Sequence, residues 1–320
     1  MRRLIAWLAL ACGCTAALAQ GYPNKPIRLV VGFAPGGAAD IIARTMSDPL
    51  ARALGQGIIV DNRPGAGSSV AAELVAKSAP DGYTIMIASQ SGMIINPIIN
   101  KNVAYSTARD FIALTQVTSS PLVVAVNPSL KVASIAELIA EAKRSPGKLN
   151  YATSGNGSLP HLATTLFSAL AGVQMVHVPY KSGGQSVQSV LAGDTQVTFA
   201  TAPSVMPLVL SGRLRGIAVT TRARSVLIAG LPGMEEAGLP GYNVSIWYGF
   251  FAPTGVPRDI AQRLFQATVQ ALQDAKLKQV LATDGTEALS SSSPEAFAAF
   301  LREETEVTAR VIRESGAKFE

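Results

Sequence analysis

The sequence predicts an α/β protein that is divided into two lobes. Short apolar segments of strand type alternate with segments of helical periodicity, and this alternation is typical of parallel sheets covered by helices. The chain has 320 residues, which exceeds the usual length of one domain, so two α/β halves are expected. Aromatic residues make up only 6 % of the chain, and the abundant alanine suits helices that pack closely on sheets.

The first residues predict export. Arg2 and Arg3 precede an apolar segment that begins at Leu4, and residues 17–19 form an Ala-x-Ala pattern. We expect a signal peptide at residues 1–19 that is cleaved near Ala19, which places the mature protein in the periplasm. The apolar segment is shorter than the roughly 20 residues that a membrane-spanning helix needs. A retained membrane anchor is the alternative.

The composition excludes several classes of site. Both cysteines, Cys12 and Cys14, lie in this leader, so we expect no disulfide, thiolate metal site or cysteine nucleophile in the mature chain. The 27 basic and 21 acidic residues give a net charge of +6. Loss of Arg2 and Arg3 leaves 25 basic residues against 21 acidic ones, a charge of +4. The basic residues form no long run, so we expect no nucleic-acid partner.

Each element follows from a local pattern. In the first third of the mature chain we expect strands at residues 27–33, 57–62 and 83–89, and helices at residues 40–54 and 68–79. The first helix stops at Gly55, and Gly/Pro-rich turns connect the elements. Further on we expect strands at residues 122–126, 149–154, 174–180, 196–201, 214–220 and 245–252, and helices at residues 135–143, 158–170, 257–281 and 294–315.

The chain is expected to cross between the lobes twice, near residues 119–122 and near residues 244–250. These crossings predict domain 1 at residues 20–120 plus 246–320. Domain 2, at residues 121–245, is then an insertion.

Two glycine-rich segments, one in each predicted domain, connect a strand to a helix. The first supplies the candidate ligand-binding residues Phe33, Pro35, Gly36, Gly37, Ala38, Ala39 and Asp40. The second supplies Ser154, Gly155, Asn156, Ser158 and His161. Free N–H groups at a helix start bind carboxylate or phosphate, and ligands of parallel sheets bind at the carboxyl ends of strands. The alternative for each segment is an ordinary tight turn with a helix cap.

Catalytic patterns are absent from the sequence. There is no G-x-S-x-G elbow, Lys181-Ser182-Gly183-Gly184 reverses the Walker order, and valine at position 70 breaks the dinucleotide fingerprint. The two histidines, His161 and His177, have no neighbours at metal-ligand spacing. His177 fits a packed position in an apolar strand, whereas for His161 ligand contact and plain helix solvation are equally good interpretations. We therefore expect a binding protein without enzymatic activity, metal or cofactor.

Several segments resemble one family in their order and spacing. They are residues 22–31, 35–40 with Arg44, 62–67, 80–84, 178–184, 211–214, 236–240 and 247–253. Together they resemble the solute receptors of tripartite tricarboxylate transporters, also called Bug-type receptors. The resemblance implies the type II periplasmic-binding-protein architecture, with two α/β lobes, a hinge and a central ligand cleft.

The resemblance also implies a mechanism and partners. Such receptors close around a small organic anion and deliver it to a membrane permease with one large and one small integral subunit. The ligand carboxylate is typically held by the two glycine-rich segments, often through ordered waters. Ser89 and Thr201 take cleft-edge positions by the same resemblance, and we expect a monomer.

The sequence departs from the family pattern at residues 90–93, 106–109, 224–234 and 306–308. The ligand stays open between a di- or tricarboxylate, an acidic amino acid and an aromatic acid. An exported two-lobed enzyme and a sensory receptor for a small organic acid are the alternative functions.

Overall fold

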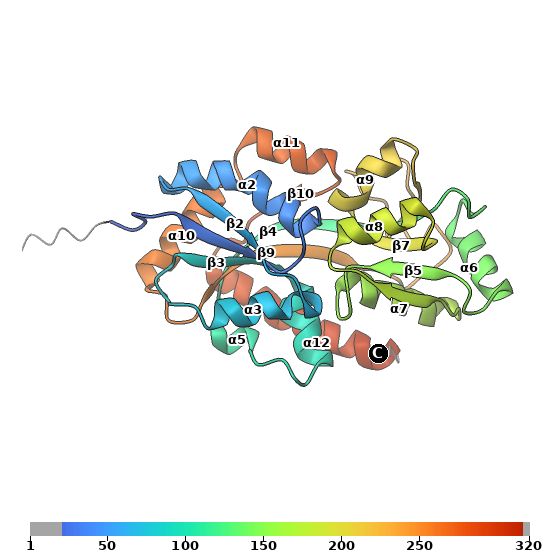
Figure 1. The fold of residues 1–320 in the computed structure, drawn as a ribbon, viewed down its shortest axis with the longest axis horizontal. Coiled ribbons are helices and arrows are strands. Elements are labelled where there is room, and N and C mark those ends of the chain that lie inside the picture. Colours follow the sequence, from blue (N-terminus) through green and yellow to red (C-terminus); the bar gives the residue numbers. More distant parts are fainter. Residues whose placement is uncertain (1–20, 316–320) are drawn as a thin grey trace, which may run out of the picture.

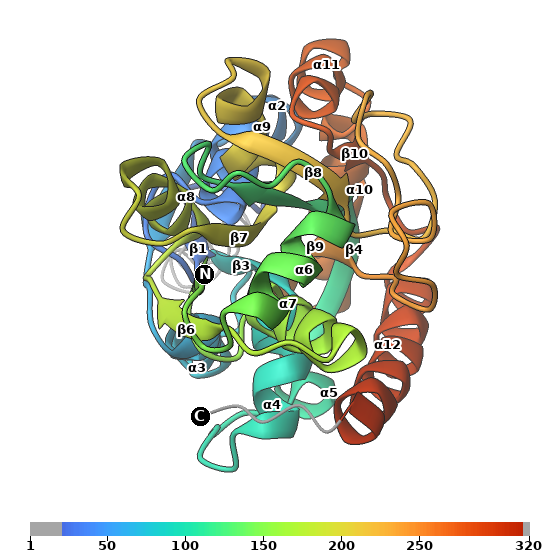
Figure 2. The same cartoon turned by 90° about the vertical axis from the view of Figure 1, so that its right-hand side faces the viewer.

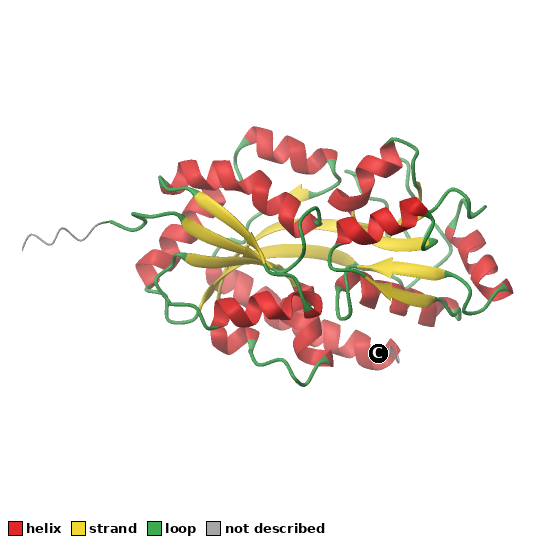
Figure 3. Cartoon of the chain, in the orientation of Figure 1, coloured by secondary structure: helices red, strands yellow, loops and turns green. Residues whose placement is uncertain are grey.

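The computed structural model describes residues 21–315, and the predicted signal peptide at residues 1–19 lies outside them. Within the described part, no helix is both long and apolar enough to cross a membrane. The molecule is elongated, with helices on both faces of a sheet that runs along its length (Figures 1 and 3).

Ten strands of the described residues form one sheet. They are β1 (Ile27–Val31), β2 (Ile58–Asn62), β3 (Thr84–Ser89), β4 (Phe111–Val126), β5 (Asn150–Thr153), β6 (Val176–Pro179), β7 (Val197–Thr201), β8 (Arg215–Val219), β9 (Ser245–Pro253) and β10 (Glu287–Ala288). The main order is β2-β1-β3-β9-β4-β7-β5-β6, and β8 and β10 also pair with β4. β1 is parallel to β2 and β3, and β5 is parallel to β6 and β7, whereas β4 and β9 run antiparallel to their neighbours.

The helices cover this sheet. They are α2 (Ala38–Leu54), α3 (Ser69–Ala76), α4 (Asn96–Ile99), α5 (Thr107–Asp110), α6 (Ile135–Arg144), α7 (Leu159–Ala171), α8 (Gly183–Ala192), α9 (Ala202–Leu210), α10 (Arg258–Ala271), α11 (Ala275–Thr283) and α12 (Pro294–Ser315). A 3-10 turn, η1 (Ala66–Ser68), precedes α3, and a π-helical turn, η2 (Ser91–Ile95), follows β3.

Strand β4 joins the two halves of the sheet. It pairs with β9 up to Pro121, opposite Ser245, and with β7 from Leu122, opposite Thr201. Proline lacks a backbone N–H group, so the ladder loses a donor where the partner changes. We call the half with β1–β3, β9, β10, η1, η2, α2–α5 and α10–α12 lobe 1, and the half with β5–β8 and α6–α9 lobe 2. Figure 2 looks onto lobe 2, with α6 and α7 nearest the viewer.

This arrangement confirms the predicted fold class, a two-lobed α/β protein. The domain bounds at residues 20–120 plus 246–320 and 121–245 stay a prediction. The change of partner at Pro121 and Leu122 is what supports them.

Two predicted elements differ from the structure by more than a few residues at their ends. The strand predicted at residues 122–126 begins at Phe111 in the structure, because the preceding residues pair with β9. The polar residues among them, such as Thr115 and Thr118, are fully buried in the sheet. The helix predicted at residues 257–281 is broken into α10 and α11, because Asp274 caps α11 by accepting a hydrogen bond from the Leu277 N–H group at 2.9 Å.

Candidate functional site

The two lobes point the carboxyl ends of their parallel strands at each other (Figure 1). From lobe 1, β1 leads through residues 32–37 into α2, and β3 leads into η2. From lobe 2, β5, β6 and β7 lead into α7, α8 and α9. Helix starts from both lobes therefore meet at the middle of the molecule.

A narrow cavity lies between these helix starts. We call it the inter-lobe cavity. It is lined by Phe33, Gly37, Ala38, Ala39, Ser91, Ser154, Pro160, Gly183, Thr201, Ile246 and Tyr248. Residues from both predicted glycine-rich segments therefore face the same space, together with the predicted Thr201.

The start of α2 offers backbone donors to this cavity. Gly37 is the N-cap residue and has no side chain that could cap the amides that follow it. Ala38 and Ala39 line the cavity, so their small side chains leave the first turn accessible. The positive end of the helix dipole favours an anion at this place.

Asp40 organises the first segment without lining the cavity. Its carboxylate accepts hydrogen bonds from the Gly36 N–H group at 3.0 Å, from Arg44 at 3.0 Å and from Asn62 at 3.0 Å. Burial alone would raise the pKa of Asp40, but these hydrogen bonds outweigh it and hold the pKa below its ordinary value. The side chain is therefore an ionised brace that fixes the turn leading into α2.

The second glycine-rich segment satisfies most of its amides within the protein. The Gly155 N–H group donates to Thr153 Oγ1 at 3.1 Å, and the Gly157 N–H group donates to His161 Nδ1 at 3.4 Å. The Leu159 N–H group, the first of α7, donates to Ser91 Oγ of lobe 1 at 2.9 Å. Of this segment, Ser154 lines the cavity.

Two further helix starts reach the cavity from lobe 2. Ser182 caps α8 by accepting from the Gln185 N–H group at 3.3 Å, which leaves Gly183 at the cavity wall. Thr201 is the N-cap residue of α9, but its side chain caps no amide and instead donates to Ser204 Oγ at 2.9 Å.

The remaining predicted residues lie around the cavity and do not line it. Ser89 Oγ accepts from the Ser91 N–H group at 3.3 Å, and Ser158 Oγ caps α7 by accepting from the His161 N–H group at 3.3 Å. Asn156 is exposed. The ring of His161 is stacked on that of His177 with 3.9 Å between centroids, so it supports the segment from behind.

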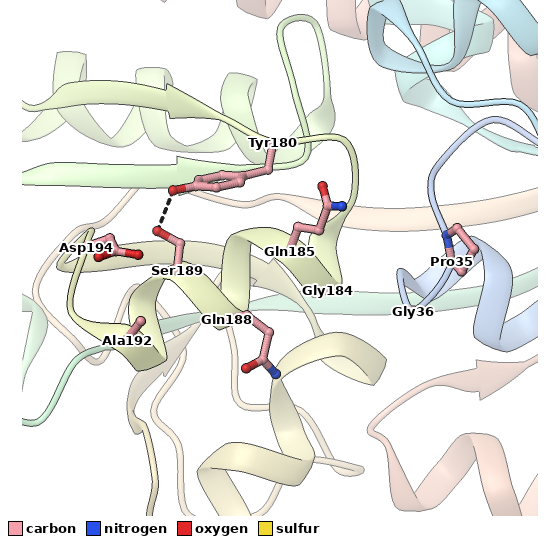
Figure 4. Close-up of a pocket in the computed structure, with 9 residues that line it drawn as sticks. All are labelled: Pro35, Gly36, Tyr180, Gly184, Gln185, Gln188, Ser189, Ala192 and Asp194. Carbon is pink, nitrogen blue, oxygen red and sulfur yellow. Dashed lines mark hydrogen bonds between the residues drawn. The ribbon is translucent and has the colours of Figure 1, made fainter.

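Pro35 and Gly36 lie at an outer groove of about 760 Å³. Figure 4 shows them on the lobe 1 segment, opposite Gly184 and Gln185 of α8. The Tyr180 hydroxyl donates to Ser189 Oγ at 2.5 Å on the far side of this groove.

Among the described residues, no charged side chain lines the inter-lobe cavity. No group of three or more His, Cys, Asp or Glu residues that could hold a metal ion occurs within residues 21–315. The polar residues that line the cavity are Ser91, Ser154, Thr201 and Tyr248, and the start of α2 adds backbone amides. Such a set can bind an anion through hydrogen bonds without a counter-ion.

Residues 42–317 match the model of the tripartite tricarboxylate transporter family receptor. The chain belongs to this family. BugT of Bordetella pertussis is 33 % identical over 99 % of each chain. The match confirms the resemblance that the sequence segments indicated. This receptor is thus a member of a family of solute-binding proteins that includes periplasmic binding proteins.

Three solved structures place this receptor among ligand-binding relatives. The periplasmic binding protein BugD is 28 % identical, with a TM-score of 0.89 over 93 % of this chain and 100 % of its own. An R. palustris protein solved with adipate is 32 % identical, with a TM-score of 0.88 over 92 % of this chain and 98 % of its own. MatC from Rhodopseudomonas palustris, solved with malate, is 27 % identical, with a TM-score of 0.86 over 91 % and 100 %.

Sequence reasoning missed some of the residues that line the cavity of this receptor. They are Ser91, Pro160, Gly183, Ile246 and Tyr248. A signal for Gly183 was present, since Ser182-Gly183-Gly184 places a cap residue and two glycines between a strand and a helix, as in the other two segments. Tyr248 gave no such signal, because an aromatic residue in an apolar strand is usually core.

Proposed function

We propose that this receptor captures a small organic acid in the periplasm and delivers it to a tripartite tricarboxylate transporter permease. Within that class the cavity favours a dicarboxylate. The relatives solved with adipate and with malate support this choice, because both of those ligands are dicarboxylates. The protein acts as a monomeric binding component and performs no chemical step.

The observation that carries this proposal is the meeting of helix starts at a cavity without charged side chains. The uncapped amides of α2 lie in lobe 1, and the starts of α8 and α9 lie in lobe 2. A ligand with a carboxylate at each end can engage both sides at once. Since a ligand favours closure only through contacts with both lobes, two acid groups suit a two-lobed receptor.

Selection for charge then rests on backbone donors, hydroxyls and bridging water. Hydrogen bonds to an ionised carboxylate are about twice as strong as neutral ones, and bridging waters are nearly as good as direct contacts. Phe33 and Ile246 provide apolar surface for the carbon chain. In this proposal Asp40 acts indirectly, by fixing the turn that leads into α2. Five other predicted residues also act indirectly, by holding the segments that line the cavity: Ser89, Gly155, Asn156, Ser158 and His161.

A thermal-shift screen of residues 20–320 tests this function. We expect dicarboxylates to raise the melting temperature in proportion to the logarithm of their concentration, as mass action requires. The corresponding dimethyl esters should have no effect, because they accept hydrogen bonds more weakly and carry no charge. Equal stabilisation by acid and ester, or no response to any organic acid, would reject the proposal.

Two substitutions locate the site. A Cβ at Gly37 would lie 3.4 Å from the Ser182 Cβ atom, so Gly37→Val pushes side-chain atoms between the starts of α2 and α8. Ser154→Ala removes a hydroxyl at the cavity wall. We expect Gly37→Val to weaken binding by at least about tenfold, or about 1.4 kcal/mol, in calorimetric titrations. Gly57→Ala is the matched control, because nothing lies within 4 Å of a Cβ at that position.

Delivery to the permease is tested by transport. Proteoliposomes that contain the permease should take up the labelled acid only when the receptor is added outside. Uptake that is equal without receptor would show that this chain serves another partner.

A further inference from the structure

The ladder between β3 and β9 stops short of the first residues of β9. Its last pair is Ser89 with Tyr248. The next residue of the chain, Gln90, has helical dihedral angles (φ −55°, ψ −22°), so its backbone turns away from the sheet into η2. The β3 backbone therefore does not reach Ser245 and Trp247, at the start of β9.

The side chain of Gln90 takes the place of the missing strand. Its Oε1 atom accepts a hydrogen bond from the Trp247 N–H group at 3.1 Å, and its Nε2 atom donates to the Ser245 carbonyl at 2.7 Å. A side-chain amide can do this because it offers a donor and an acceptor, as a peptide group does. Gln90 is 4 % exposed, so loss of its amide would leave buried backbone groups unsatisfied.

Gln90 joins two segments that both contribute to the cavity wall. Ile246 and Tyr248 line the inter-lobe cavity from β9, and Ser91, the neighbour of Gln90, lines it from η2. The two hydrogen bonds of the Gln90 amide hold the β9 backbone on either side of Ile246. The relative position of these three cavity residues therefore depends on a side chain that does not line the cavity itself.

Lobe 2 holds the same stretch of chain up to the residue before β9. The Val244 N–H group donates to the carbonyl of Thr220, which follows β8, at 2.9 Å, and Thr220 Oγ1 donates to the Val244 carbonyl at 2.7 Å. The same Oγ1 atom accepts from the Leu122 N–H group of β4 at 2.8 Å, and Thr220 is fully buried. The bonds to Thr220 thus end at Val244, and the bonds to Gln90 begin at Ser245.

We propose that Gln90 is a positioning residue of the binding site. It fixes β9 to lobe 1, so that Ile246 and Tyr248 move with lobe 1 when the lobes open and close. Bending of this connection is then confined to the peptide that joins Val244 to Ser245. The effect on ligand affinity rests on the proposed function, whereas the attachment of β9 to lobe 1 does not depend on it. A preformed wall strengthens binding, because the ligand does not have to order it.

Two substitutions test the role of the Gln90 amide. Gln90→Met keeps a side chain of similar length and removes both hydrogen bonds. Gln90→Asn keeps the amide on a shorter side chain, which cannot reach β9 as glutamine does. Because asparagine remains polar and fits the same space, this second variant keeps the test open if Gln90→Met does not fold.

Asn127→Leu is the matched control. Asn127 does not line the inter-lobe cavity, yet its side-chain amide also joins two backbone groups. It donates to the Val190 carbonyl at 2.7 Å and accepts from the Ser129 N–H group at 2.8 Å. Leucine resembles asparagine in shape, so this variant removes the same kind of hydrogen bonds without touching β9. Both Gln90→Met and Asn127→Leu should lower the urea midpoint of unfolding.

The first readout needs no ligand. Trp247 is the only tryptophan of residues 20–320, so labelling with ¹⁵N-tryptophan gives one backbone amide signal in the NMR spectrum. The acceptor of this amide is Gln90 Oε1. We expect both Gln90 variants to speed its hydrogen exchange by at least about tenfold, because one hydrogen bond is lost, and Asn127→Leu to leave it unchanged. An unchanged exchange rate in the Gln90 variants would overturn the proposal.

The second readout is the affinity for the dicarboxylate that gives the largest thermal shift. We expect both Gln90 variants to raise its dissociation constant about tenfold, as one displaced hydrogen-bonding group would, and Asn127→Leu to change it less than about twofold. Parent-like affinity in the Gln90 variants, or an equal loss in Asn127→Leu, would overturn the positioning role. If no organic acid binds the parent, the proposed function fails, and the exchange of the Trp247 amide still decides whether Gln90 holds β9 to lobe 1.

Discussion

Asp40 shows that a residue can shape the binding cavity without facing it. Its carboxylate is 4 % exposed and accepts hydrogen bonds from Gly36, Arg44 and Asn62. These three partners come from the turn, from the helix and from strand β2. The geometry of the uncapped α2 amides therefore depends on one buried charge.

Replacement of Asp40 by asparagine should lower the free energy of unfolding at pH 7 by roughly 1–3 kcal/mol, the cost of weakened charged hydrogen bonds at a buried site. Because the folded pKa of Asp40 lies below its ordinary value, its contribution is fully present above the ordinary pKa. It is lost as the pH falls through the lowered folded pKa. Urea unfolding at pH 7 measures the effect. Asp48→Asn, at an exposed position of the same helix, should change the free energy of unfolding little. An equal loss in both variants would show that the hydrogen bonds of Asp40 do not stabilise the fold.

Tyr248 lines the cavity from β9, the strand that leads out of lobe 2. Burial raises its pKa well above the ordinary value, so the phenol stays protonated and can donate to a carboxylate. We expect Tyr248→Phe to weaken binding of the dicarboxylate by about tenfold, which corresponds to about 1.4 kcal/mol for one lost charged hydrogen bond. The unfolding midpoint should change little, because the ring remains. Unchanged affinity would show that this hydroxyl does not contact the ligand.

At the scale of elements, the second glycine-rich segment rests on a pair of histidines. The His161 and His177 rings are stacked, and Tyr151 stacks on His177 with 5.0 Å between centroids. His177 Nε2 hydrogen-bonds with Thr153 Oγ1 at 2.6 Å, at the base of the segment. The Gly157 N–H group donates to His161 Nδ1, which requires that nitrogen to be unprotonated. Two neutral imidazoles thus hold both ends of the turn.

This pair predicts a loss of stability in mild acid. Burial, with His177 nearby, lowers the pKa of His161 to about 3, and burial lowers the pKa of His177 to about 4. Both values lie below the ordinary 6.5, so the unfolded chain binds more protons between these values. The free energy of unfolding should therefore fall as the pH drops from about 6.5 towards about 4, by up to about 1.4 kcal/mol per pH unit and histidine.

Urea unfolding between pH 7.5 and pH 5 measures this slope. His161→Asn and His177→Gln keep a neutral hydrogen-bonding atom near the native position but cannot titrate. Combined in one protein, they should flatten the pH dependence in this range. If the slope persists, other groups cause it.

The elements differ in how far the sequence could predict them. The strand β1 and the start of α2 follow from an apolar run, two glycines and an acidic first turn, all of which are local. No strand was predicted over the first half of β4, where Thr115 and Thr118 interrupt the apolar residues and are nevertheless fully buried beside β9. The partnered amides of α7 depend on Ser91, which is 68 residues away in the chain. No local pattern can report such a contact.

At the scale of the whole molecule, charge and binding site are separate. The net charge of the chain is +6, yet none of the described residues that line the inter-lobe cavity is charged. We expect the dissociation constant of the dicarboxylate to change by less than about threefold between 50 and 300 mM salt, because buried interactions are screened weakly. Titration at both ionic strengths checks this. A larger change would indicate that an exposed cation, such as Lys181, holds the ligand.

The two-lobed architecture was predictable because alternating strands and helices and the length of the chain fix it together. The position of the cavity followed from the rule that ligands bind at the carboxyl ends of parallel strands. How tightly the lobes meet was not predictable. It depends on the close approach of Gly36 to Gly184 and of Gly67 to Asn156, and sequence patterns carry no information about contacts between separate lobes.

The pairing of Pro121 with Ser245 has a consequence for how such receptors diversify. Residues directly opposite each other in an antiparallel ladder lie about 4.5–5.5 Å apart, so the chain leaves lobe 1 and returns to it at almost the same point. A segment whose two ends are adjacent can be exchanged between related genes as one cassette, since the path of the remaining chain is undisturbed. Recombination at these two positions could transplant half of a binding site in a single event.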